Sequence, residues 1–403
     1  MRTCRWRILW TTGSMLTRMA LTVTALPVGQ GDAFLLRTRS GNVLVDGGKS
    51  QHFLPELLRR QRVKALRVVA CTHADADHAN GLIGLLRDPV WFGHVREVWL
   101  PGGWSERLHD LIARPDLFEE ELLGDIERAP SAYTLDVDAP DDYAPRPGDT
   151  GGARGGEELA HDVADLSDEI AHSVDGHESP YLRWPYRFLT SVGSEKAELW
   201  HDAVRCAERI RDIATAAVDA GVLIRWFDFD EAERLGSASG GERFLRPINS
   251  VEITRKSTRP RPRALEFLRL SLSNRRSLVF TCEAPGGDAA ALLTADSDLA
   301  SIRKAPTAAH LLVTAPHHGA ESNSSAYSLA SGWSTTVETT WIRSDGCFST
   351  RPGLTYLNQK TRYCTRCRLT RRPRSHSCPR AIDVRWNGKK WTADGPACRC
   401  TSR

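Results

Sequence analysis

The chain has 403 residues, of which 41% are hydrophobic and 26% are charged. This composition is typical of a globular protein and excludes a disordered or fibrous chain, while the length allows one large α/β domain with insertions. The net charge is only +4, which is too small to identify a partner.

The charge is unevenly distributed along the chain. Residues 116–178 contain 19 acidic side chains against three arginines, whereas residues 343–403 contain 15 basic side chains against three aspartates. The basic end could attract a polyanion, although either stretch could equally be a solvated surface.

No stretch approaches the roughly 18 consecutive apolar residues of a membrane helix. Residues 1–18 contain arginines but lack a sustained apolar core, so they are interpreted as an N-terminal extension and not a signal peptide. We therefore expect a cytoplasmic protein with reduced thiols and no membrane partner.

Strands and helices alternate through the first hundred residues, which favours a layered α/β sandwich. Each predicted strand is short and apolar, and each predicted helix has one apolar face. The predicted strands are 21–26, 33–38, 42–46, 66–71 and 95–100, and the predicted helices are 53–62 and 79–87.

The pattern changes between about 104 and 245, which we interpret as a largely helical insertion. Helices are predicted at 116–128 and 195–220, on either side of a loose Gly/Asp/Pro-rich segment around 137–180. Strands are then predicted at 265–272, 277–282, 290–294 and 310–314. The main domain is expected to span 19–345, followed by a basic, cysteine-rich tail at 346–403.

The strongest chemical signal is His73-x-Asp75-x-Asp77-His78, directly after the strand 66–71. Four side chains with nitrogen and oxygen donors within six residues can converge on a divalent metal. The alternative is a polar, solvated turn. Because the loop follows a strand and leads into a helix, we predict a metal site.

Two further strand ends carry the same kind of side chain. Asp296 follows the apolar strand 290–294, and His317 and His318 follow the strand 310–314. A site for two cations needs such convergence, with one carboxylate free to bridge them.

These motifs together resemble the metallo-β-lactamase superfamily, and within it the hydrolase domain of ComEC-type competence proteins. The resemblance covers about 20–100 and 265–345 and implies an αββα sandwich. It is carried by Val28–Asp32, Val45–Gly48, His73–His78, Asn274–Val279 with Leu292–Asp296, and Pro316–Gly319.

The resemblance implies a role for each matching residue. The cations would be two divalent ions, Zn²⁺ or Mn²⁺, with Asp296 bridging and Asp77 also orienting the attacking water. Asp46 would hydrogen bond to a ligand histidine, and His318 and Asn274 would contact the substrate or donate a proton. Asp32, like Asp46 and Asn274, would support the ligands or contact the substrate, although its glycine turn explains it without chemistry. The implied ligands are His73, Asp75, Asp77, His78, Asp296 and His317.

The sequence also departs from the family pattern. Asp75 stands where many relatives have histidine, which favours harder ions such as Mn²⁺. Arg351-Pro352 replaces an expected His-Pro pair, and an arginine there could hold a phosphate. A further expected histidine is not identifiable among His94, His109, His161, His172, His177 and His201.

The tail offers a second metal site. Cys364-x-x-Cys367 with His376-x-Cys378 resembles a structural zinc knuckle, and Cys398-x-Cys400 follows further on. The alternative is a variable tail with incidental thiols. The surrounding arginines would suit phosphate contact.

The sequence therefore predicts a metal-dependent hydrolase that uses an activated water. The resemblance points to a phosphodiester substrate, which could be nucleic acid. Alternatives are an ester, thioester or lactam hydrolase of the same fold, or a non-catalytic metal-binding interaction module with a zinc-knuckle tail.

Overall fold

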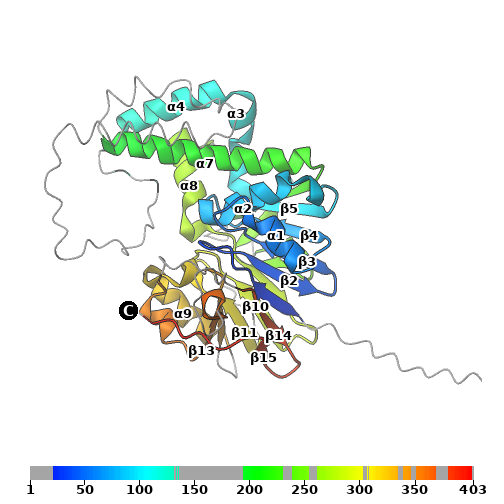
Figure 1. The fold of residues 1–403 in the computed structure, drawn as a ribbon. Coiled ribbons are helices and arrows are strands. Elements are labelled where there is room, and N and C mark those ends of the chain that lie inside the picture. Colours follow the sequence, from blue (N-terminus) through cyan, green and yellow to red (C-terminus); the bar gives the residue numbers. More distant parts are fainter. Residues whose placement is uncertain are drawn as a thin grey trace, which may run out of the picture.

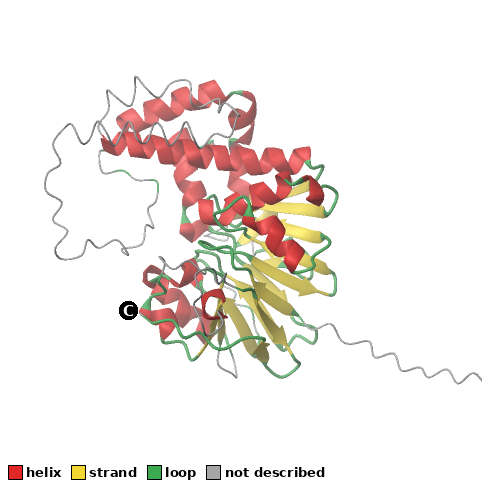
Figure 2. Ribbon diagram, in the orientation of Figure 1, coloured by secondary structure: helices red, strands yellow, loops and turns green. Residues whose placement is uncertain are grey.

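The computed structural model describes residues 21–130, 133, 135, 194–229, 238–253, 261–302, 306, 308–334, 339–345, 351–368 and 380–401. Within these residues the strands form one sheet of nine strands and one of six, which pack face to face. Helices cover the outer face of each sheet (Figures 1 and 2). The mixed α/β architecture expected from the sequence is confirmed.

The nine-stranded sheet combines an antiparallel meander with a parallel half. β1, β2 and β3 pair antiparallel, and β3 to β6 then pair parallel. Parallel neighbours require a crossover connection, and helices provide it. The strands in spatial order are β15 (Trp391–Ala393), β14 (Ile382–Trp386), β1 (Thr22–Ala25), β2 (Phe34–Thr38), β3 (Gly41–Val45), β4 (Leu66–Ala70), β5 (Val95–Pro101), β6 (Leu223–Phe229) and β8 (Ser250–Ile253). The crossover helices are α1 (Phe53–Arg60), α2 (Ala76–Arg87), α3 (Leu108–Ala113), α4 (Pro115–Arg128) and α7 (Ser194–Asp219).

The six-stranded sheet is parallel over β10 to β13 and antiparallel at β9 and β7. Helices α9 (Ser324–Gly332) and α10 (Leu354–Leu357) connect its last three strands. In spatial order the strands are β13 (Thr361–Cys364), β12 (Thr340–Arg343), β11 (His310–Thr314), β10 (Ala289–Leu293), β9 (Phe280–Glu283) and β7 (Arg246–Pro247).

The central strands are apolar on both faces because both are buried. Val43 and Val45 of β3 belong to the core between the sheets, while Leu44 between them packs toward the helices. Neighbouring side chains of a strand point to opposite faces, so one short strand contributes to two cores. This explains why the strands appear in the sequence as continuous apolar runs.

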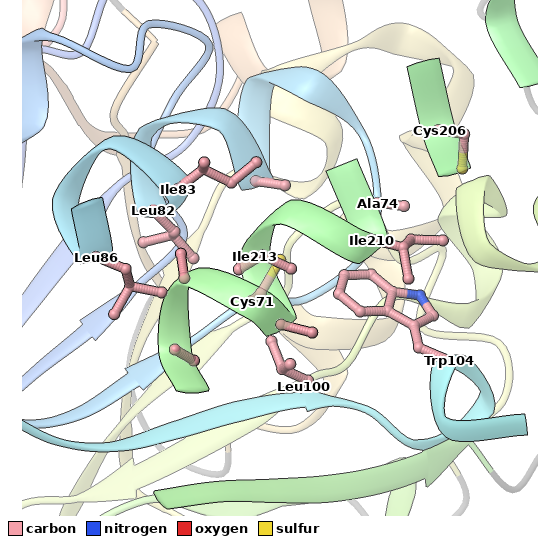
Figure 3. Packing of buried hydrophobic residues seen from close by; sticks show 14 of the residues in the cluster. Cys71, Ala74, Leu82, Ile83, Leu86, Leu100, Trp104, Cys206, Ile210 and Ile213 are labelled. Atoms are coloured by element: carbon pink, nitrogen blue, oxygen red, sulfur yellow. The ribbon is translucent and has the colours of Figure 1, made fainter. Parts of the chain in front are cut away.

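Helix α7, which lies in the predicted insertion, packs closely on the rest of the domain. Its Ile210 lies beside Trp104 and its Ile213 beside Cys71, in the same cluster as Leu82 and Leu86 of α2 (Figure 3). Helix α7 is therefore part of the main hydrophobic core.

The strand predicted at 265–272 is wrong. These residues form helix α8 (Ala264–Leu272), which buries Leu265, Phe267 and Leu268 and exposes Glu266. A short run rich in leucine satisfies both the strand and the helix pattern. Tertiary packing decides here, since Phe267 contacts Phe118 of α4 edge to face.

Both regions expected to lie outside the core sandwich contribute strands to it. The insertion ends in β6, which pairs with β5, and the tail provides β13, β14 and β15. β14 pairs with β1, so strands from opposite ends of the described chain are neighbours.

Some expectations concern residues outside the described part, namely the N-terminal extension 1–18 and most of the loop around 137–180. Among the helices that are described, none combines the length and apolar character needed to cross a membrane.

Candidate metal centre

The candidate site lies where loops leave the carboxyl ends of parallel strands. Asp46 follows β3 and the segment 72–78 follows β4, while Asp296 follows β10 and His317 follows β11. Carboxyl ends of parallel strands share one edge of a sheet, which is where α/β proteins place their ligands. His78 and His318, although 240 positions apart, lie 3.3 Å from one another at their Nε2 atoms.

Four histidines turn their Nε2 atoms toward the carboxylate of Asp296. Oδ1 of this carboxylate lies 3.2 Å from Nε2 of His78 and 3.7 Å from Nε2 of His318. Oδ2 lies 3.6 Å from Nε2 of His73 and 3.7 Å from Nε2 of His317. Each oxygen of Asp296 therefore faces a different pair of histidines.

Two of these histidines have a carboxylate at their other ring nitrogen. Nδ1 of His78 lies 2.9 Å from Asp46, whose carboxylate also accepts hydrogen bonds from the backbone N–H and hydroxyl of Thr72. Nδ1 of His318 lies 3.2 Å from Asp32. A carboxylate on one ring nitrogen is the usual way to orient the other nitrogen as a metal ligand.

The remaining two histidines have hydroxyl partners instead. Nδ1 of His73 lies 3.0 Å from Oγ1 of Thr72, and Nδ1 of His317 lies 3.4 Å from Oγ of Ser322. The Nε2 atoms of all four histidines can therefore bind a ligand in the same small volume around Asp296.

Asp75 and Asp77 add two carboxylates to this volume. Asp75 lies 3.4 Å from Nε2 of His73, and Asp77 lies 3.2 Å from Nε2 of His318. Within the described residues, three groups of ligand atoms lie close enough to hold an ion, and two of them share Asp296. These two groups are His73, Asp75 and Asp296, and Asp32, His78, Asp296 and His318.

The electrostatics of the site demand positive charge. Burial lowers the pKa of His78, but the carboxylates of Asp296 and Asp46 outweigh it and raise this pKa well above its usual value. Burial likewise opposes the rise at His73, yet the nearby carboxylates of Asp296 and Asp75 raise its pKa to about 9. Without metal, protons on the histidines balance the buried carboxylates.

The donor set fits divalent cations. Nε2 of His73 and Oδ1 of Asp296 are buried and have no hydrogen-bond partner among the described residues, which is costly unless another ligand satisfies them. Imidazole nitrogens and carboxylate oxygens are the donors that Zn²⁺ and Mn²⁺ use. A cation on each side of Asp296 would replace the histidine protons.

The late histidine loop has a strained backbone. His317 and His318 have φ values of 47° and 51°, in the left-handed region that residues with a Cβ seldom adopt. Hydrogen bonds hold it, from His317 N–H to Ala295 O at 3.0 Å and from Ala320 N–H to His317 O at 2.7 Å. The Arg343 guanidinium also donates to the carbonyl of His318. Such conformations cluster at functional sites, where surrounding structure enforces them.

Asp32 does more than fill a turn. Gly31, with φ of 95°, brings the turn so close to α2 that an added Cβ would lie 1.9 Å from the carbonyl oxygen of Asp77. The Asp32 N–H then donates to that carbonyl at 3.2 Å, and its carboxylate faces His318. Burial raises the pKa of Asp32, an effect that His318 partly offsets.

Thr72, Ser322 and Arg343 were not predicted from the sequence as site residues. Arg343 is 1% exposed and pairs with Asp345 at 2.9 Å, while it supports His318 from behind. A charged residue at the end of the apolar strand β12 was the available signal for Arg343. The two hydroxyls had no distinctive signal, because serine and threonine are frequent in loops.

Other residues considered in the sequence belong to neither ligand group. Asn274 is buried in the segment between Ser271 and Leu278. Both of these residues hydrogen bond to the backbone of the segment 72–78, the metal loop. Arg351 is exposed. Two residues further along, the Gly353 N–H donates to the carbonyl of Gly319, which follows His318, at 2.8 Å. His94, His109 and His201 join neither ligand group, and His161, His172 and His177 lie outside the described residues.

The cysteine ligands are arranged differently from the expected zinc knuckle. His376 and Cys378 lie outside the described residues. Cys364 and Cys367 instead lie with Cys398 and Cys400 in one group of four sulfurs. Pairing by nearest sequence neighbours missed this arrangement, because the chain passes through β14 and β15 before it returns.

The inserted helix α7 holds the metal loop directly. Nε of Arg209 donates to the carbonyl of Ala74 at 2.7 Å, and the Ala74 N–H donates to the carbonyl of Ser271 at 3.0 Å. Ala74 lies between His73 and Asp75, so these bonds fix the backbone that carries two candidate ligands.

Replacing Arg209 by alanine should therefore weaken metal binding about tenfold, the lower end of the effect of removing a residue that orients a metal ligand. Isothermal titration with Mn²⁺ or Zn²⁺ measures this. The matched control is Arg205→Ala, one turn earlier on α7, where the arginine contacts His201 instead. If the two variants bind the metal with equal affinity, Arg209 does not contribute to metal binding through Ala74.

A pocket of about 270 Å³ opens beside the metal loop. One wall is formed by Thr72 and His73, and the other walls come from the loop after β5, from β6 and from α8. The lining is mixed and includes four aromatic rings and three charged side chains besides His73. The residues that matter here are Trp104, Phe227, Phe229 and Phe267, together with Glu106, Asp228 and Arg276.

Comparison with known proteins agrees with this geometry. Residues 26–162, about a third of the chain, match the family model of the metallo-beta-lactamase superfamily. The matched part includes the segment from His73 to His78, whereas Asp296 and His317 lie beyond it. No curated protein matches the chain.

Proposed function

We propose that this protein is a metal-dependent hydrolase that activates water with two divalent cations sharing Asp296. The observation that carries the proposal is the common orientation of four histidines, whose Nε2 atoms all face this one carboxylate. Because each Nδ1 has a carboxylate or hydroxyl oxygen within 3.4 Å, the arrangement favours metal ligation over simple ion pairing.

The two sides of Asp296 define two ligand sets. His73, Asp75 and Oδ2 of Asp296 would hold one cation, and His317, on the same side, would take the place of the family histidine missing from this sequence. His78, His318 and Oδ1 of Asp296 would hold the other cation. This assignment makes His318 a ligand, where the sequence favoured a substrate contact or proton donor.

When bound, the cations would lower the pKa of a water and stabilise charge on the attacked centre. Asp77, whose carboxylate lies 3.2 Å from Nε2 of His318, would accept a hydrogen bond from that water and orient it. Asp46 and Asp32 would keep His78 and His318 in the ligand orientation through their Nδ1 atoms.

The preferred substrate is a phosphodiester, and nucleic acid is one candidate. Support comes from the motif resemblance to the competence hydrolase domain, from the basic C-terminal region and from the arginines near the site. Arg276 lines the pocket, and Arg351 is exposed beside the late histidine loop. A guanidinium is well suited to binding phosphate oxygens.

The pocket also favours a second candidate, an ester, thioester or lactam with an apolar group. Phe227, Phe229 and Phe267 would bind such a group, while Glu106 and Asp228 would repel a polyanion. The same catalytic centre could serve either reaction, because one fold hosts many chemistries.

The test compares bis(p-nitrophenyl) phosphate, p-nitrophenyl acetate and a chromogenic lactam, each with added Mn²⁺ or Zn²⁺. Phosphodiester hydrolysis that is abolished by EDTA and falls at least about 100-fold in Asp77→Ala would support the proposal. If only the acetate or lactam is hydrolysed, the second candidate replaces the first. Equal rates for wild type and Asp77→Ala would refute the mechanism.

A further inference from the structure

Four cysteine sulfurs converge at the edge of the six-stranded sheet, away from the histidine cluster. Cys364 ends β13 and Cys367 lies one turn further on, while Cys398 and Cys400 belong to the last described segment. Sulfur–sulfur distances are 3.4 Å and 3.7 Å from Cys364 to Cys398 and Cys400. The corresponding distances from Cys367 are 3.8 Å and 3.5 Å.

These distances fit a tetrahedral metal site and not disulfide bonds. Four sulfurs about 2.3 Å from a tetrahedral Zn²⁺ lie about 3.8 Å from one another, whereas bonded sulfurs are about 2.05 Å apart. All four cysteines are free thiols, and all four sulfurs lie within 4.8 Å of one another.

The backbone offers a hydrogen bond to one of the sulfurs. The backbone N–H of Arg399 donates to the sulfur of Cys367 at 3.1 Å. A metal-bound sulfur is a thiolate, and a backbone N–H donor suits such a sulfur.

The cluster joins the end of the chain to an edge strand. β13 is the last strand of its sheet, and the Cys398 N–H donates to the carbonyl of Arg362 on it at 2.8 Å. Cys364 and Cys398 are buried in the apolar core beneath α9. A metal here would fix the segment that covers this sheet edge and protect it from pairing with other chains.

The strand that carries Cys364 also pairs with β12, whose last residue, Arg343, supports His318. Cys364 is opposite Arg343 in the pairing of β13 with β12, and Arg343 donates to the His318 carbonyl. Thr365, next along the chain, donates to the carbonyl of Ser344 at 2.7 Å. A shift of β13 would therefore move the end of β12, from which Arg343 holds the backbone of His318.

We propose that Cys364, Cys367, Cys398 and Cys400 bind one structural Zn²⁺ that anchors the C-terminal segment on β13 and stabilises the strand end supporting His318. The proposal stands independently of the hydrolase function.

Metal analysis of the purified full chain tests this proposal with three variants. Cys400→Ser should lose one equivalent of zinc, whereas His73→Ala should keep that equivalent, because its ligands are elsewhere. Cys282→Ser is the matched control, since Cys282 is a buried free cysteine on β9 outside the cluster. Equal zinc content in Cys400→Ser and Cys282→Ser would overturn the proposal.

Two measurements on the wild type apply even if Cys400→Ser fails to fold. Titration with a mercurial should release one zinc as four of the ten thiols of the chain react, and Co²⁺-substituted protein should show thiolate-to-metal charge transfer with the strong d–d bands of a tetrahedral site. Zinc release unconnected to thiol reaction, a Co²⁺ spectrum without charge transfer, or a native mass that shows two disulfides would each refute the site.

Discussion

Asp296→Asn should lose both cations and reduce hydrolysis by at least about 100-fold. Loss of a residue that merely orients a ligand costs about 10- to 100-fold in metal affinity, and Asp296 lies between both ligand groups. The amide retains the shape of the side chain but removes the negative charge and offers a single acceptor oxygen. Metal content after gel filtration and the rate with the best substrate measure the two effects.

The matched control for this change is Asp298→Asn, two residues further along. Asp298 accepts a hydrogen bond from the Ala300 N–H at 2.9 Å, and asparagine retains an acceptor for it. Asp298→Asn should therefore bind two equivalents of metal and keep its activity. If Asp296→Asn also binds two equivalents, Asp296 does not bridge.

The metal-free protein should lose stability as the pH rises. The folded-state pKa of His73 is about 9, above its unfolded value of about 6.5, so the protonated form is stabilised by folding. That contribution is complete below about pH 6.5 and is lost as the pH rises through 9. For a side chain that is 2% exposed, the loss is about 3 kcal/mol. His78 and His318 act in the same direction.

Urea unfolding of EDTA-treated protein at pH 6.5 and pH 9 measures this loss. The metal-loaded protein should show no comparable fall, because cations replace the protons and bind better to neutral histidine. His73→Gln should reduce the pH dependence of the metal-free protein, whereas His109→Gln, at an exposed position, should leave it unchanged. A metal-free protein equally stable at both pH values would contradict the charge balance described for the site.

Local periodicity was enough to predict much of the fold. The strands around 21–46, 66–71 and 95–100 and the long helix near 195–220 are present within a few residues, because each has a clear apolar pattern and a glycine or polar boundary. The segment 264–272 was missed since a leucine-rich run fits both strand and helix. Strands in the tail were missed because β13 and β14 are short and rich in polar residues.

The candidate site was predictable where ligand-type residues follow strands directly. His73 to His78, Asp296 and His317 all have that context. The residues that support the ligands were not predictable. Thr72 and Ser322 are of types frequent in loops, and Arg343 acts on His318 through a contact between two segments that are separate in the sequence. The same reason explains the cysteines: the sequence paired Cys364 and Cys367 with near neighbours, whereas the fold brings Cys398 and Cys400 back to β13.

Anomalous diffraction from crystals of the Mn²⁺- or Zn²⁺-loaded protein tests the shared carboxylate most directly. Two peaks about 3.5–4 Å apart, one on each side of Asp296 with histidine nitrogens around both, are the predicted result. Absence of metal at Asp296, or one ion with the other histidines still paired to carboxylates, would contradict a centre of two cations.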